Sequence, residues 1–114
     1  MGKKVEYKQN LKGIGVTGSN VDVIDVKVPS GYKRTLQSIS CENETTAFTY
    51  LRIGYDRDGT KHWWVEQKSP SLGTLYWLDD PKVLEEGDIL TCRFNGTVDD
   101  DVLATYVDGF TEKV

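Results

Sequence analysis

The stretch AFTYLRIGYDRDGTKHWWVEQ, residues 47–67, contains two apolar segments separated by a short polar turn. In the first segment Leu51, Ile53 and Tyr55 occupy every second position, the period that places side chains on one face of a β-strand. The turn is Asp56-Arg57-Asp58-Gly59, where glycine adopts a positive φ at little cost. This stretch therefore predicts a β-hairpin, the unit of an antiparallel sheet.

The same alternation continues on both sides of this hairpin, and Gly, Asn, Asp and Pro interrupt it about every ten to fifteen residues. A phase slip at Val23-Ile24 predicts a β-bulge, and Val83–Glu86 is expected to form one helical turn. The predicted strands are Lys3–Lys8, Val21–Val28, Tyr32–Cys41, Ala47–Tyr55, Lys61–Gln67, Thr74–Leu78, Ile89–Phe94 and Val102–Val107.

No segment has the apolar spacing of a helix long enough to link parallel strands. We therefore expect an all-β fold, a two-sheet antiparallel sandwich, with an eight-stranded jelly roll as the leading topology. A closed barrel and an immunoglobulin-like sandwich are the alternatives.

The length of 114 residues suits one domain, so residues 1–114 are expected to form a single sandwich in which 1–20 are an N-terminal arm or an edge strand. The net charge of −4 disfavours binding to nucleic acid, because phosphate recognition depends on clustered Lys and Arg. No apolar stretch approaches the length of a signal-peptide core or of a membrane span. We expect neither a nucleic acid nor a membrane as partner.

Two glycine-containing motifs resemble known sites, one for a dinucleotide and one for calcium. Gly13–Gly18 matches G-x-G-x-x-G, but it runs into another strand, whereas a dinucleotide site needs a helix there. Asp56–Gly59 begins like a calcium loop, but its glycine stands at the fourth position and Gln67 stands at the twelfth. Neither motif predicts a cofactor or a metal, and none is expected.

The remaining polar candidates do not predict catalysis. His62 is the only histidine and has no recognisable nucleophile or metal partner in the sequence. Asp99–Asp101 could converge with Asp79 and Asp80 on a divalent cation, although solvated loop charge is the preferred interpretation. We therefore expect a protein that is not an enzyme.

Cys41 and Cys92 both lie in predicted strands. Free cysteine is among the most buried residue types, which favours two small core residues. A disulfide between them remains open at this stage, because the sequence does not give the separation of their Cα atoms.

Four aromatic residues, Trp63, Trp64, Tyr76 and Trp77, form adjacent pairs in two predicted strands. Neighbours in a strand point to opposite faces, so one member of each pair is expected outside the core. The exposed aromatic side chains would suit a protein interface or stacking on sugar rings, and partial burial under the 68–73 loop is the structural alternative.

Three segments resemble those of small jelly-roll virion proteins of tailed bacteriophages. They are VPSGYKRTL (residues 28–36), LEEGDIL (84–90) and DDVLATYVDG (100–109). The resemblance implies a capsid decoration or head-associated protein that is located in the virion, contacts capsid proteins and forms a homo-oligomer. Lys3 and Lys4 would then belong to an arm that reaches a neighbour. The alternative function is a carbohydrate-binding module that uses its exposed tryptophans.

Overall fold

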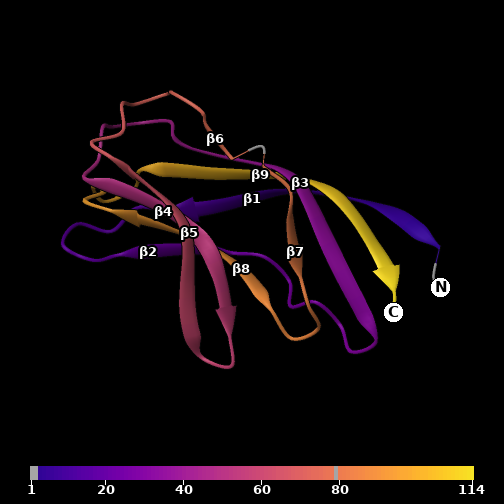
Figure 1. Ribbon diagram of the computed structural model, residues 1–114. Coiled ribbons are helices and arrows are strands. Elements are labelled where there is room, and N and C mark those ends of the chain that lie inside the picture. Colours follow the sequence, from indigo (N-terminus) through magenta and orange to yellow (C-terminus); the bar gives the residue numbers. More distant parts are fainter. Residues whose placement is uncertain (1–2, 79) are drawn as a thin grey trace.

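The computed structural model describes residues 3–78 and 80–114, and in these residues it contains β-strands and no helix. The strands are arranged in two facing antiparallel sheets (Figure 1). This confirms the predicted all-β sandwich. The strands are β1 (Lys4–Ile14), β2 (Val21–Ile24), β3 (Tyr32–Asn43), β4 (Tyr50–Arg57), β5 (Thr60–Lys68), β6 (Tyr76–Leu78), β7 (Lys82–Leu84), β8 (Ile89–Asn95) and β9 (Val102–Lys113).

The strand order is that of a jelly roll. One sheet has the order β1-β9-β3-β6, with β7 also paired to β3, and the other has the order β2-β8-β4-β5. Because β6 and β7 pair with successive parts of β3, they occupy one strand position that is interrupted in the middle. The first strand, β1, pairs with the last, β9, and the second strand, β2, pairs with the second-last, β8. This is the arrangement of a long hairpin that is rolled into two sheets.

The predicted hairpin, β4 and β5, is the closed end of this long hairpin, and β5 is an edge of its sheet. Arg57 pairs with Thr60, and the two residues between them, Asp58 and Gly59, have φ angles of 53° and 85°. Two positive φ angles match the right-handed twist of the flanking strands, which is why Asp-Gly is favoured in two-residue hairpin loops.

The core lies between the sheets and receives side chains from both. Large residues buried there include Leu36 and Leu103 from the five-stranded sheet and Leu51, Leu90 and Phe94 from the four-stranded sheet. Every second residue of β3, β4, β8 and β9 contributes over much of the strand length, as the alternation in the sequence predicts.

Two local predictions are wrong. The segment expected to start a helical turn instead forms β7, because Lys82, Val83 and Leu84 pair with β3. The shift of alternation does not occur at Val23-Ile24: Val23 is buried and Ile24 is exposed, so the alternation continues there.

Asp25 explains the second error. Its carboxylate points inward, where it accepts hydrogen bonds from the Tyr7 hydroxyl at 2.7 and 2.8 Å and lies 3.8 Å from the Arg34 guanidinium. Burial and the hydrogen bond to Asp25 raise the pKa of Tyr7 to about 12. A buried carboxylate is tolerated when it is paired in this way, and an apolar pattern does not reveal such a position.

Residues from Lys4 to Ile14 pair with β9 along the whole length of β1, which is an edge strand in the described part of the chain. The Gly13–Gly18 segment forms the end of β1 and the turn toward β2. Figure 1 shows the ends of β3 and β9 extending beyond the four-stranded sheet, on the side where both termini lie. Met1 and Gly2, at the start of the predicted arm, lie outside the described residues.

Candidate interaction site at the open side of the sandwich

The side of the sandwich between β5 and β6 is open and apolar. These strands are edges of the two sheets, and the hollow between them has a volume of about 70 Å³. Its lining comes from β4, β5 and β6: Leu51, Ile53, Val65, Gln67, Tyr76 and Trp77. We call this set of residues the side hollow.

A loop holds β6 at the rim of the side hollow. The Tyr76 hydroxyl accepts a hydrogen bond from the Ser71 backbone N–H at 2.8 Å, and the Gly73 N–H donates to the Asn43 carbonyl oxygen at 2.8 Å. Tyr76 packs against the core, whereas the next residue, Trp77, is 64% exposed. The short strand therefore presents one large apolar side chain to solvent beside an apolar hollow.

A β-bulge in β5 separates the two other tryptophans. Ile53 pairs with Val65, and the next residue, Gly54, pairs with Trp63, so Trp64 is the extra residue. Gly54 is required there, because a Cβ atom would overlap the His62 carbonyl oxygen. The bulge changes the face that each following side chain of β5 reaches.

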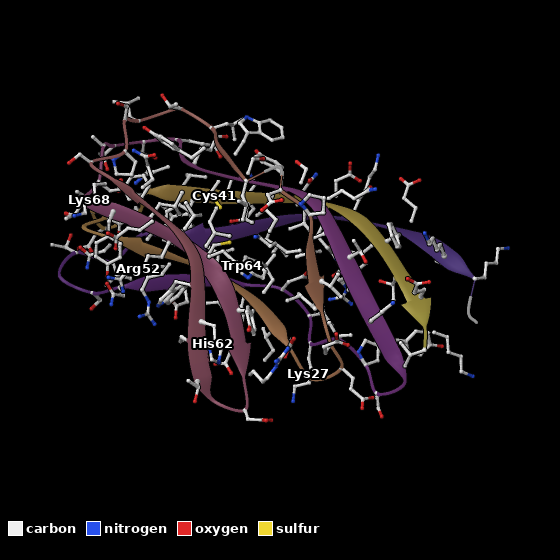
Figure 2. All side chains as sticks on the ribbon, in the orientation of Figure 1. Lys27, Cys41, Arg52, His62, Trp64 and Lys68 are labelled. Carbon is white, nitrogen blue, oxygen red and sulfur yellow. The ribbon has the colours of Figure 1, made fainter. Side chains whose placement is uncertain are left out.

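Trp64 faces the interior, where its ring centroid lies 5.3 Å from that of Tyr55 (Figure 2). Trp63 lies on the outer face near two guanidinium groups, and its ring centroid is 5.9 Å from the guanidinium of Arg52 and 5.1 Å from that of Arg93. Those arginines are paired in turn with Glu66 and Asp22. Trp63 thus belongs to a charged cluster and is half-buried.

The six residues predicted from the sequence as an interface therefore separate. Trp77 and Tyr76 reach the side hollow, Trp64 joins the core and Trp63 joins the arginine cluster. Lys3 lines a second groove near the termini, with Val5, Tyr7, Tyr32 and Thr111 among its other walls. Lys4 places its ammonium group 4.5 Å from the ring centroid of Phe110.

Sequence reasoning missed Leu51, Ile53, Val65 and Gln67 as members of the side hollow. Leu51 and Ile53 read as ordinary core residues, which they also are. Val65 and Gln67 reach the hollow only because of the register after the bulge, and no short pattern in the sequence signals that register.

The described members of the predicted acidic group, Asp80 and Asp99–Asp101, do not converge as a cation site would require. Asp101 is buried and accepts hydrogen bonds from Asn43 Nδ2, Thr46 Oγ1 and the Val98 N–H, at 2.9, 2.6 and 2.8 Å. Burial would raise the pKa of Asp101, but these hydrogen bonds outweigh it and lower the pKa. Among residues 3–78 and 80–114 no group of three His, Cys, Asp or Glu side chains is placed to hold a metal ion.

Asp99 and Asp80, which belong to the same predicted acidic group, have partners of their own. Asp99 accepts a hydrogen bond from the Thr17 N–H, and Asp80 pairs with Lys82. Asp79 lies outside the described residues. His62 stacks on Tyr55 with ring centroids 4.9 Å apart, beside the hairpin turn.

No helix in the part of the chain that the structure describes has the length and apolar character needed to cross a membrane. No protein-family model matches the sequence, and no curated protein sequence matches it.

Comparison with solved structures finds similarity to the Bacillus endospore appendages described as a novel family of disulfide-linked pili. The TM-score is 0.55 at 9% identity, over 100% of this chain and 91% of the pilus chain. A weaker similarity is to PirA, with a TM-score of 0.38 at 14% identity over 90% of this chain and 92% of that chain. At these identities the similarity concerns the fold.

These findings correct the expectation of a tailed-phage protein. The jelly-roll layout that suggested a virion protein is shared over the full chain with a subunit of a spore-surface pilus. The assignments to a capsid decoration protein and to the virion are therefore wrong. The alternative of a glycan-binding module is not supported either, since three of the four aromatic residues pack on the core or near arginines.

Proposed function

We propose that this chain is a structural, non-enzymatic subunit that assembles with further copies of itself. The observation that carries the proposal is Trp77, which is 64% exposed beside the side hollow. Tryptophan is enriched among the residues that dominate binding energy at protein interfaces. Covering this side chain with a second copy would remove a large apolar surface from water.

A second apolar surface suits the same role. The groove near the termini has a volume of about 460 Å³ and is lined in part by Val5, Tyr7 and Tyr32. Val5 and Tyr32 are 59% and 38% exposed. Two different surfaces that bind each other generate a head-to-tail assembly, which continues as a fibre if it does not close into a ring.

The long edge strands are poorly suited to pairing with another copy. β5 carries Lys61, Glu66 and Lys68 as well as the bulge, and β1 carries Lys8 and Lys12. Charged side chains and bulges are the devices that keep sheet edges from pairing. We therefore propose contacts through side chains at the side hollow and the terminal groove.

The fold of a pilus subunit supports a role in assembly, and that pilus is described as disulfide-linked. Cys41 and Cys92 are both completely buried in this chain. A disulfide between copies needs accessible thiols, so the assembly that we propose is non-covalent.

The test is the mass of the purified protein by light scattering over a range of concentrations, with negative-stain electron microscopy of the concentrated sample. We expect mass to rise with concentration and filaments or rings to form. Trp77→Ser and Val5→Ser should each lower the association, because they change the two proposed surfaces separately.

A matched control is Val26→Ser, which changes a side chain that is 63% exposed after β2, at the other edge of the four-stranded sheet. It should leave association unchanged. A wild-type protein that remains a monomer at every concentration would contradict the proposal. A closed dimer that Trp77→Ser abolishes and Val5→Ser does not affect would retain the side hollow and reject the head-to-tail geometry.

A further inference from the structure

The two cysteines lie in central strands of opposite sheets. Cys41 is in β3, between Thr105 of β9 and Tyr76 of β6, and Cys92 is in β8, between Val23 of β2 and Ile53 of β4. Both side chains belong to the same buried core cluster and have no exposed surface. Figure 2 shows Cys41 in the space between the two sheets.

The two thiols share one buried cluster at the core. The Cys41 sulfur lies 3.4 Å from the Thr105 hydroxyl oxygen, and Thr105 is itself completely buried. The neighbouring Cys41 thiol and burial raise the pKa of Cys92 well above its ordinary value. Cys92 is therefore held as a neutral thiol in the cluster that also contains Cys41.

We propose that Cys41 and Cys92 form an intramolecular disulfide that joins the two sheets when the chain folds in the presence of a small-molecule disulfide such as oxidised glutathione. The two strands are central in facing sheets, so the fold brings both thiols into the same buried cluster between the sheets. An inter-sheet disulfide between core strands is also the arrangement of antibody sandwiches.

The reaction proceeds by two exchanges. The thiolate of one cysteine attacks glutathione disulfide, which gives a mixed disulfide and releases one glutathione thiolate. The thiolate of the second cysteine then attacks the protein sulfur of the mixed disulfide and releases the second glutathione. The two cysteines lose two electrons, glutathione disulfide gains them, and the protons of the two thiols pass to the released glutathione.

Burial determines when this reaction occurs. In the folded chain neither sulfur is accessible and the thiolate of Cys92 is disfavoured, so exchange is slow. During folding the thiols are still accessible, and the sheets then bring them together. The same burial protects the finished bond from reduction and prevents bonds between folded copies.

The experiment is refolding of the full chain with reduced and oxidised glutathione, followed by unfolding in N-ethylmaleimide and measurement of the intact mass. We expect a monomer about 2 Da lighter than the dithiol form and without maleimide adducts, in which peptide mapping links Cys41 to Cys92. Its melting temperature should exceed that of the same protein refolded in dithiothreitol by about 10 °C.

Folded reduced protein exposed to the same oxidant should acquire the bond much more slowly. Cys41→Ala and Cys92→Ala should each carry one maleimide or glutathione adduct, and reductant should not change their melting temperatures. Two maleimide adducts on the refolded wild type, or disulfide-linked dimers in place of the internal bond, would overturn the proposal. The wild-type comparison does not require any variant to fold. Because the mass of the single unfolded chain is measured, the result does not depend on self-assembly.

Discussion

Arg57 and Asp88 form a two-point ion pair that joins the end of β4 to the residue before β8. Arg57 Nε lies 2.8 Å from Asp88 Oδ1, and Nη2 lies 2.7 Å from Oδ2. The Asp88 carboxylate is completely buried and also accepts the Glu85 N–H at 2.9 Å. The pair thus anchors the turn that leads into a central strand.

Arg57→Ala should lower the free energy of unfolding, because it leaves a buried carboxylate without its cation. Arg57→Lys should restore only part of the loss, since an ammonium group cannot bind both oxygens in the same planar geometry. Urea unfolding measures both. Lys82→Ala, which removes an exposed pair with Asp80, is the control and should have little effect. Equal losses for the Arg57→Ala and Lys82→Ala variants would contradict this prediction.

Stability should fall in acid because of Asp88 and Asp101. Burial opposes the ionisation of both carboxyl groups. Hydrogen bonds outweigh burial at both residues, together with the Arg57 ion pair at Asp88, and lower each pKa below the ordinary 3.8. A carboxyl group whose pKa is lowered by folding stabilises the folded state at pH values above its pKa in the unfolded chain. That stabilisation is lost as the pH falls through its pKa in the folded chain. The melting temperature should therefore decline below about pH 4. A value that stays constant between pH 6 and pH 3 would exclude this linkage.

The Asp101 network can be tested at neutral pH. Asp101→Ala leaves Asn43 Nδ2, Thr46 Oγ1 and the Val98 N–H without their acceptor and should cost about 2 kcal/mol of unfolding free energy. Asp99→Ala, in the same turn but exposed, should cost no more than about 0.5 kcal/mol. Thermal and denaturant unfolding of the two variants would show the difference, and similar losses would argue against a special role for Asp101.

Gly54→Ala should destabilise the chain by about 2 kcal/mol or more, because the new methyl group meets the backbone of β5 at the bulge. Gly31→Ala offers a contrast: no atom lies within 4 Å of its added Cβ, and only its φ of +84° is unfavourable. That strain costs about 1 kcal/mol. If the two variants unfold at the same denaturant concentration, close packing at Gly54 is not the dominant constraint.

Trp64 and Trp77 should differ in what they contribute to stability. Trp64→Ala should lower the free energy of unfolding by about 2 kcal/mol, because its ring packs on Tyr55 and the core. Trp77→Ala should change it by less than about 0.5 kcal/mol, because the ring is exposed. Fluorescence provides a second measurement: loss of Trp77 should shift the mean emission to the blue. A large loss of stability in Trp77→Ala would mean that its effect on association is indirect.

The sequence alone determines the class of fold. Alternation at Leu51, Ile53 and Tyr55 and the Asp58-Gly59 turn depend on strand period and on the φ angles that a two-residue loop demands. Both are local properties of the chain, so they could be predicted before any contact between distant residues was known.

The tertiary structure decided which side chains meet. Asp25 points inward because the Tyr7 hydroxyl donates a hydrogen bond to it and Arg34 forms an ion pair with it. Trp64 reaches the core because a bulge shifts the alternation of β5. Trp77 is exposed because its neighbour Tyr76 takes the inward position. Cys41 and Cys92 enter one buried cluster because their strands lie at the centres of opposite sheets. Asp25 and the two cysteines are placed by elements distant in sequence, and Trp64 and Trp77 by the pairing of their strands, so no local periodicity fixes these positions.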